Sequence, residues 1–298
     1  MSSERRKTIL DARLHDPGAF AVAAARRVQP ASLFNERGRM MIIAADHPAR
    51  NALRAGGRAL AMGDRADLLD RLCTALARPG VNGVLGTADI LDDLLLLGAL
   101  DGKVVFGSMN RGGLSGSVFE MDDRFTGYDA AAIAASGFQG GKMLLRIDVD
   151  DSATVDTLAA CARAVSELAD RRSIALIEPF LSHRIDGRVS NELTAEAMIR
   201  ASVIAAGLGP TSAYTWLKVP VVDEMERVMA ATTLPALILG GEAGDDVDAA
   251  YESWGRALQL PTVFGLVIGR RLLYPPGDDV AAAVDTAVGL FGAVHAVA

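Results

Sequence analysis

Short runs rich in Val, Ile and Leu alternate with longer segments of helical periodicity from about residue 40 to the end of this 298-residue sequence. Strands that alternate with helices form a parallel sheet, because each crossover helix returns the chain to the end of the sheet at which the previous strand began. The pattern predicts eight strands. They are Met40–Ala45, Val81–Gly86, Lys103–Ser108, Gly141–Ile147, Ile174–Glu178, Tyr214–Val219, Ala236–Leu239 and Val263–Ile268.

Eight strand-and-helix units that close on themselves give a (β/α)8 barrel, or TIM barrel, of about 250 residues. The sequence therefore predicts one barrel domain over residues 1–298, with residues 1–39 as a helical extension that covers the barrel bottom. An open, doubly wound sheet is the alternative, but it should carry a Gly-rich turn after its first strand. Asp46-His47-Pro48-Ala49-Arg50 stands there instead.

The predicted helices are Arg65–Ala77, Tyr128–Ala135, Ser152–Ala169, Glu196–Ala206, Val222–Ala231, Val247–Leu258 and Val280–Val294.

The composition argues against several classes of protein. Acidic and basic residues are interspersed at a net charge of −7, so we expect no nucleic-acid partner. No apolar run reaches the roughly twenty residues that cross a bilayer, and the first residues do not resemble a secretion signal. Cys73 and Cys161 have neither disulfide nor metal-ligand spacing. We therefore predict a cytoplasmic protein without a membrane partner, and the apolar outer faces of its helices favour a homo-oligomer.

Two lysines stand inside predicted strands, in a chain that has four lysines against twenty-six arginines. Lys218 lies in the apolar run Tyr214–Val222, and Lys142 lies in the run Gly141–Asp148. Burial of an ammonium group lowers its pKa and so provides the neutral amine that attacks a carbonyl carbon. The pattern indicates Schiff-base chemistry. The alternative is a pair of lysines that reach solvent or form structural ion pairs.

Polar residues that end the apolar runs are candidate site residues, because the carboxyl ends of barrel strands form the active face. Asp46 and Glu178 end the first and fifth strands, and either carboxylate could take a hydroxyl proton during aldol cleavage. A helix cap or a salt bridge at the rim is the alternative for both. The candidate substrate-binding residues are His47, Arg50, Asn110, Arg111, Arg146, His183 and Arg184; His183 and Arg184 are expected on a loop able to close over the site. The alternatives are a hydrogen bond that holds the loop for His47, a solvated side chain for Arg50, and incidental polar residues of a flexible Gly-rich loop for Asn110 and Arg111.

Glycines follow the last two predicted strands. Gly240 and Gly241 begin the segment Gly240–Gly244, and Gly269 precedes Arg270. Glycines let backbone N–H groups approach an anion, and the loops after strands seven and eight commonly bind phosphate in this fold. The pattern predicts a phosphate site formed by Gly240, Gly241, Gly269 and Arg270. Ordinary turns are the alternative explanation of the glycines.

These segments resemble those of the class I aldolase superfamily, which includes deoxyribose-phosphate, tagatose-bisphosphate and archaeal-type fructose-bisphosphate aldolases. The resemblance spans residues 40–275. Leu217–Val221 resembles the Schiff-base segment of the sixth strand, and Gly141–Leu145 resembles the lysine segment of the fourth. Ala44–His47 is similar to the first-strand motif of the proton relay, and Glu178 falls where the family has an acid. Pro48 and the long loop 108–127 depart from the family pattern.

The resemblance implies a class I aldolase in which Lys218 forms the Schiff base and Lys142, Asp46 and Glu178 complete the catalytic set. The chain looks closest to a branch associated with myo-inositol breakdown, which implies cleavage of 2-deoxy-5-keto-gluconate 6-phosphate to dihydroxyacetone phosphate and malonate semialdehyde. With four histidines in all, we expect neither a metal nor another cofactor. The alternatives are a deoxyribose-phosphate-type aldolase and a sugar-phosphate-binding barrel without catalysis.

Overall fold

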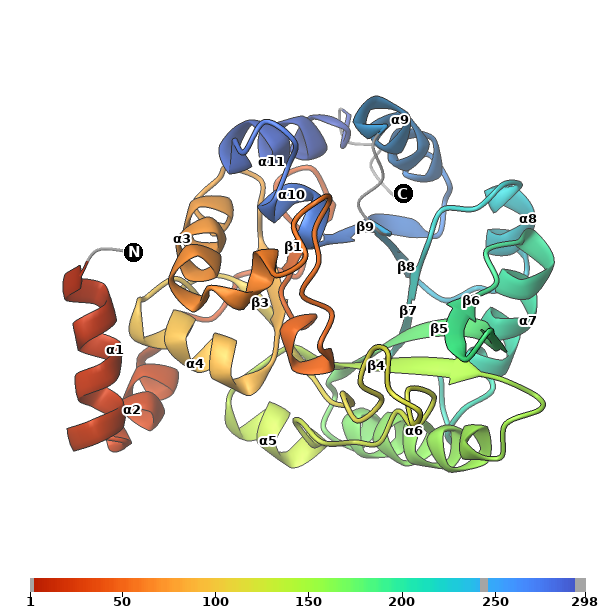
Figure 1. Cartoon of the computed structure of the whole chain (residues 1–298), viewed down its shortest axis with the longest axis horizontal. Helices are drawn as coiled ribbons and strands as arrows, with labels where there is room; N and C mark the ends of the chain where they lie inside the picture. The colour runs from red at the N-terminus through yellow and green to blue at the C-terminus, as the bar shows by residue number, and fades with distance from the viewer. Residues whose placement is uncertain (1–2, 242–245, 293–298) are drawn as a thin grey trace.

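Eight parallel strands close into a barrel in the computed structural model, which describes residues 3–241 and 246–292 (Figure 1). Neighbouring strands pair in the order β4-β3-β2-β1-β9-β8-β7-β5, and the pairing of β5 with β4 closes the ring. This arrangement confirms the predicted TIM barrel. The strands are β1 Met40–Ala44, β2 Gly83–Gly86, β3 Val104–Ser108, β4 Gly140–Ile147, β5 Ile174–Ile185, β7 Thr215–Val219, β8 Ala236–Leu239 and β9 Val263–Ile268.

Helices surround this ring, and all seven predicted helices are present with slightly different bounds. Within the described part of the chain, none is long and apolar enough to cross a membrane. The helices of the barrel region are α3 Arg65–Leu76, α4 Ala88–Leu96, α5 Ala130–Ala135, α6 Ala153–Asp170, α7 Ala195–Ala206, α8 Met225–Ala230, α9 Val247–Ala257, α10 Arg270–Leu273 and α11 Val280–Gly289, with 3-10 turns at Pro48–Arg50 and Ala61–Gly63. Helices α4 and α10 add to the predicted set, and Val294, the predicted end of the last helix, lies outside the described residues.

The N-terminal helices lie beside the barrel, which corrects the expectation that they cover its bottom. Helices α1 (Ser3–His15) and α2 (Gly18–Arg26) pack against α4 (Figure 1). Helix α2 has no fully buried side chain, and its partly buried Ala23 and Ala24 pack against the outer hydrophobic core. The segment that follows it supplies Phe34, whose ring stacks on Trp216 at 6.2 Å and lies 6.0 Å from Phe264. An apolar plug fits there because the inner side chains of the lower barrel are apolar.

Strand β5 continues beyond the barrel as one arm of a hairpin. It pairs antiparallel with β6 (Arg188–Asn191) through Asp186 and Gly187, which have φ angles of 50° and 75°. Two consecutive left-handed residues are typical of a two-residue hairpin turn, and Asp-Gly favours it. His183 and Arg184 therefore lie on a strand, and the expected loop around them is wrong.

Residues two positions apart on a strand face the same side, and this periodicity places the site. The inward side chains of the lower barrel are apolar, and they include Ala44, Leu176 and Trp216. Two positions further along their strands stand Asp46, Glu178 and Lys218. The inner surface therefore changes from apolar to charged at the carboxyl end of the barrel, where these side chains converge.

Candidate active site

Glu178 lies between two lysine side chains inside the mouth of the barrel. The Lys218 Nζ is 2.5 Å from Glu178 Oε1, and Lys142 Nζ contacts Glu178 Oε2. Lys142, Glu178 and Lys218 come from neighbouring strands β4, β5 and β7, and are 1%, 8% and 5% exposed. Neither lysine reaches freely into solvent, so the arrangement is a buried lysine–carboxylate–lysine triad.

Asp46 joins this triad from the end of β1. Its Oδ2 lies 3.3 Å from Lys142 Nζ and also contacts Arg111 Nη2. Ser108 Oγ donates to the same oxygen over 3.2 Å and accepts from Arg111 Nε over 3.0 Å. We refer to the five ionisable residues Asp46, Arg111, Lys142, Glu178 and Lys218 as the reactive cluster. Arg111 is the member that comes from the loop after β3 rather than from the end of a strand.

The reactive cluster holds three potential cations against two carboxylates. Burial lowers the pKa of Lys142, with help from the Arg111 charge, and it lowers the pKa of Lys218. Burial also lowers the pKa of Arg111 to about 10. Burial opposes the charge of Glu178 as well, but the two lysines outweigh it and hold the pKa of Glu178 well below its usual value. Loss of one lysine proton neutralises the cluster, which favours a free amine in the barrel mouth.

His47 stands at the edge of the cluster with a neutral ring. Its Nδ1 lies 3.8 Å from Asp46 Oδ1 and has no hydrogen-bond partner among the described residues. Burial and the nearby charges of Arg270 and Lys218 hold the pKa of His47 well below its usual value. A neutral imidazole can donate to or accept from a substrate hydroxyl. The structure therefore places His47 where its predicted contact with substrate is feasible.

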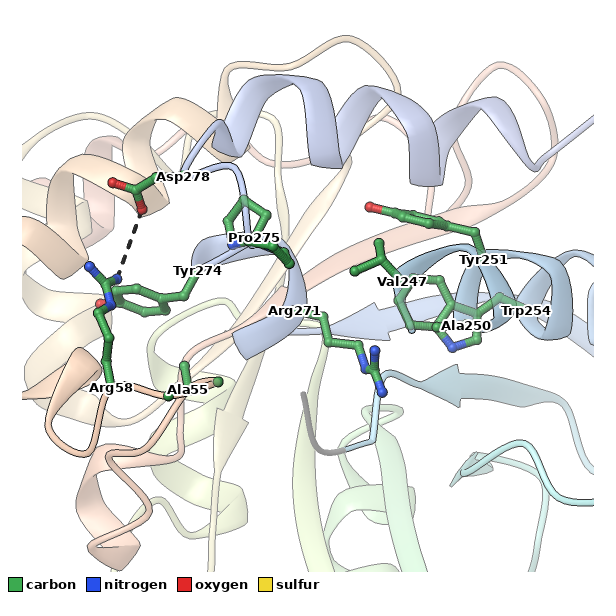
Figure 2. Close-up of a pocket in the computed structure, with 13 residues that line it drawn as sticks. Ala55, Arg58, Val247, Ala250, Tyr251, Trp254, Arg271, Tyr274, Pro275 and Asp278 are labelled. Atoms are coloured by element: carbon green, nitrogen blue, oxygen red, sulfur yellow. Dashed lines mark ion pairs between the residues drawn. The ribbon is translucent and has the colours of Figure 1, made fainter. Parts of the chain in front are cut away.

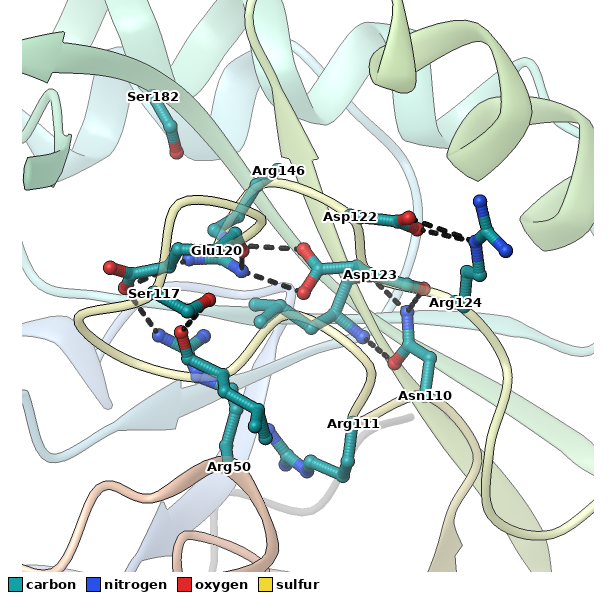
Figure 3. Close-up of polar contacts among 12 residues, drawn as sticks. Arg50, Asn110, Arg111, Ser117, Glu120, Asp122, Asp123, Arg124, Arg146 and Ser182 are labelled. Atoms are coloured by element: carbon teal, nitrogen blue, oxygen red, sulfur yellow. Dashed lines mark hydrogen bonds and ion pairs between the residues drawn. The ribbon is translucent and has the colours of Figure 1, made fainter. Parts of the chain in front are cut away.

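Four residues fix the loop between β3 and α5 to the barrel, and we refer to them as the loop network (Figure 3). Arg146 Nε and Nη2 contact the carboxylate of Asp123 at 2.8 and 2.7 Å. Glu120 Oε1 lies 3.4 Å from Arg146 Nη1 and 3.3 Å from Arg50 Nη2. The network pairs two cations with two carboxylates, unlike the reactive cluster. Arg50 and Arg146, predicted to bind substrate, thus hold the loop in this structure.

Asn110 adds a second anchor to the same loop. Its side-chain amide accepts from Leu144 N at 2.7 Å and donates to Leu144 O at 2.6 Å. Asn110 Nδ2 also donates to the carbonyl oxygen of Asp123 over 3.2 Å. Asn110 therefore continues the hydrogen bonding beside β4, and it is an anchor of the loop rather than a free polar side chain.

Removal of Arg146 is expected to destabilise the fold strongly. Arg146→Leu leaves Glu120 and Asp123 buried without their main cation, which should lower the free energy of unfolding by about 3–5 kcal/mol. Denaturant unfolding followed by circular dichroism measures the change. Arg124→Leu is the matched control, because Arg124 is 76% exposed and pairs with Asp122 at the surface of the same loop. Its cost should stay below about 1 kcal/mol, and equal losses in the two variants would contradict the role of the network.

His183 and Arg184 lie at the rim, away from the reactive cluster. The half-exposed His183 ring has Nε2 at 3.3 Å from Glu192 of the same hairpin. Arg184 Nη2 donates to Val118 O over 3.0 Å and lies 3.6 Å from Asp151. Arg184 thereby connects the β5–β6 hairpin to the loop that carries Arg111.

The predicted phosphate-binding residues lie at the ends of β8 and β9. A side chain at Gly269 would clash with Ala44 O and with the His47 ring, so glycine is required there. Arg270 Nη1 donates to Arg54 O over 3.3 Å, and Gly240 O accepts from Arg271 Nε at 2.9 Å. Gly241 has a φ of 66°. Glu242, Ala243 and Gly244 of the predicted segment lie outside the described residues.

A family model described as Cgl0159-like matches residues 38–288. The crystal structure of Cgl0159 from Corynebacterium glutamicum is 50% identical and has a TM-score of 0.95, with 98% of each chain covered. An archaeal fructose 1,6-bisphosphate aldolase has a TM-score of 0.65 at 16% identity and covers 91% of this chain and 98% of its own. A Schiff-base-forming fructose-1,6-bisphosphate aldolase has a TM-score of 0.63 at 16% identity, and the match covers 91% of this chain and 99% of the aldolase chain. No curated protein matches. The chain thus shares its TIM-barrel fold with these two aldolases.

Proposed function

This chain belongs to the Cgl0159-like family, and we propose that it is a class I aldolase that cleaves a phosphorylated keto sugar or sugar acid through a Schiff base. The observation that carries the proposal is the position of Glu178 between the amino groups of Lys142 and Lys218. A carboxylate that contacts two buried amines can move protons to and from a nitrogen that attacks a carbonyl. The shared fold of a Schiff-base-forming fructose-1,6-bisphosphate aldolase agrees with this chemistry.

In the proposed reaction the Lys218 amine attacks the substrate ketone, and loss of water from the adduct gives an iminium ion. Asp46 takes the proton of the hydroxyl group on the far side of the bond that breaks. That hydroxyl becomes the aldehyde carbonyl, and the electron pair of the C–C bond moves to the iminium to form an enamine. The aldehyde leaves, the enamine takes up a proton at carbon, and water hydrolyses the iminium to release the keto-phosphate and Lys218.

The contacts within the cluster suggest different roles for the two lysines. Lys142 touches both carboxylates, whereas Lys218 touches Glu178 alone. Lys142 is therefore suited to orient Asp46 and Glu178, and Lys218, the more exposed of the two, is suited to attack. Glu178 then serves the proton transfers at the Lys218 nitrogen, which leaves Asp46 for the substrate hydroxyl.

A substrate with a carboxylate close to the scissile bond fits the charge of the cluster. We propose 2-deoxy-5-keto-gluconate 6-phosphate, whose cleavage gives dihydroxyacetone phosphate and malonate semialdehyde. Its carboxylate would accept hydrogen bonds from the Arg111 guanidinium, which contacts Asp46 in this structure. Transfer of Arg111 to the substrate leaves Asp46 with one fewer cation and makes it a stronger base. Gly240, Gly241, Gly269 and Arg270 would bind the phosphate at the other end.

A deoxyribose-phosphate-type aldolase is the alternative within the same chemistry, and it needs no partner for Arg111. Cleavage assays with the sugar-acid phosphate and with deoxyribose 5-phosphate separate the two. Arg111→Leu should impair the acid substrate selectively if Arg111 binds its carboxylate. Equal loss with both substrates would contradict the sugar-acid proposal but not the Schiff base.

Borohydride trapping tests the Schiff base directly. Intact-mass analysis after incubation with dihydroxyacetone phosphate and sodium borohydride should show a reduced adduct on the wild-type chain and none on Lys218→Met. Lys103→Met is the matched control, because the Lys103 amine bonds to Val81 O and does not contact the reactive cluster. An adduct that persists in Lys218→Met but disappears in Lys142→Met would move the nucleophile to Lys142. Absence of any adduct with keto-phosphates and aldehydes would favour a binding protein without catalysis.

A further inference from the structure

A cavity of about 500 Å³ lies outside the reactive cluster, between α9, α10 and the turn at residues 55–58 (Figure 2). None of the five residues of the reactive cluster lines it. Its volume falls within the range of small-molecule sites, roughly 300–1,000 Å³. The cavity is therefore large enough for a ligand of its own.

The charged side chains of the cavity leave one cation in excess. Asp278 is its single lining acid among the described residues, and it already contacts Arg71 at 2.7 Å and Arg58 at 3.9 Å. Arg271 lines the opposite side, and no carboxylate of the described residues pairs with it. Partial burial lowers the pKa of Arg271, yet the group stays charged at neutral pH. A cavity with one excess positive charge is suited to bind an anion.

The Arg271 guanidinium is held in place by the protein backbone. Its Nε donates to Gly240 O over 2.9 Å, which fixes the planar group while Nη1 and Nη2 make no hydrogen bond to the described residues. These two nitrogens can donate together to one phosphate or carboxylate group. A guanidinium that is fixed in advance loses little side-chain entropy when an anion binds.

The wall beside Arg271 is apolar and partly aromatic. Helix α9 contributes Val247, Ala250, Tyr251 and Trp254, and the Tyr251 and Trp254 rings pack edge to face at 5.1 Å. Tyr251 Oη donates to Ala283 O, so its ring is fixed as well. Pro275 and Pro276 restrict the backbone of the facing wall. A rigid apolar wall next to one fixed cation fits a ligand with an apolar or aromatic body and one anionic group.

We propose that this cavity is a second ligand site, separate from the lysine chamber, that binds a small organic anion with an aromatic or apolar body. The anionic group contacts Nη1 and Nη2 of Arg271, and the body lies along α9. The proposal does not depend on the aldolase reaction, because no residue of the reactive cluster takes part.

Isothermal titration calorimetry of the full chain with phenyl phosphate tests this site. We expect saturable binding at one site per chain, at least about 10-fold tighter than binding of inorganic phosphate, because the apolar wall should contribute the difference. Arg271→Gln should weaken phenyl phosphate binding about 10-fold or more through loss of a charge-assisted contact. Ala250→Phe, which fills the cavity from α9, should abolish binding even if Arg271→Gln folds poorly.

Arg270→Gln and Lys218→Met are the matched controls, and both should bind phenyl phosphate like the wild type. Weakening in Arg270→Gln but not in Arg271→Gln would place the ligand in the proposed substrate phosphate site and overturn the inference. Loss of binding in Lys218→Met would place it in the lysine chamber, with the same consequence. Absence of saturable binding to the wild type, or equal affinity for phenyl phosphate and inorganic phosphate, would also overturn it.

Discussion

With Asp46 replaced by asparagine, borohydride is expected to trap the intact substrate on Lys218 instead of the keto-phosphate half. The variant keeps the Lys218–Glu178 pair that we propose to form the iminium, but it lacks the carboxylate that we propose to take the hydroxyl proton. Turnover should fall roughly 10²- to 10⁴-fold, which is the usual contribution of a general base. The two adducts differ in mass by the aldehyde product, so intact-mass analysis distinguishes them in one experiment.

Two controls make the Asp46→Asn result specific. Asp122→Asn changes a carboxylate that pairs with Arg124 at the surface of the loop, and it should leave turnover unchanged. Glu178→Gln should slow formation of the adduct itself, since Glu178 contacts the attacking nitrogen. If Asp46→Asn still accumulates the product adduct while Glu178→Gln accumulates the substrate adduct, the roles of the two carboxylates are reversed.

The positions of the four proposed catalytic residues are predictable from the sequence because two simple rules determine them. Short apolar runs that alternate with helical segments identify the strands. The barrel then brings the carboxyl ends of these strands together. Asp46, Glu178 and Lys218 stand at or near the ends of apolar runs, and Lys142 lies within a fourth run, so the sequence predicts that they meet. The structure brings these four residues into contact, in a triad that Asp46 joins through Lys142.

The loop network is not predictable in the same way. Glu120 and Asp123 lie in a Gly-rich loop without periodicity, and the sequence gives no reason to bury them. Their burial becomes clear only when Arg146 of β4 and Arg50 lie beside them. A charged residue in a strand has two explanations, substrate contact or structural ion pair, and the choice depends on a partner far away in the sequence.

The hairpin of β5 and β6 shows a different reason for an incomplete prediction. The apolar run of β5 ends near Leu181, and the strand is exposed from His183 to Ile185. Backbone pairing with β6, not hydrophobic burial, maintains this part of the strand. The Asp186-Gly187 pair is the sequence pattern that identifies the turn.

The rate of adduct formation should rise with pH and level off at a lower pH than it would for an exposed lysine, whose ordinary pKa is 10.5. Burial lowers the pKa of Lys218, so the reactive neutral amine is present at a lower pH than on an exposed lysine. Below that pKa, each pH unit should reduce the rate about tenfold, because the neutral fraction falls by that factor. Initial rates of adduct formation, sampled between about pH 6 and pH 11 and quenched with borohydride, measure the profile.

Glu178→Gln should shift the pH profile of adduct formation in a direction that the structure predicts. The Glu178 carboxylate raises the pKa of Lys218 and so opposes the effect of burial. Its neutral replacement leaves Lys218 beside the charges of Arg111 and Arg270 without this compensation, so the rise of the profile should shift to lower pH. The plateau rate should fall at the same time, because Glu178 no longer transfers protons at the attacking nitrogen. A wild-type profile with its midpoint at or above pH 10.5, or a shift of the variant to higher pH, would contradict a buried, carboxylate-restrained Lys218 as the nucleophile.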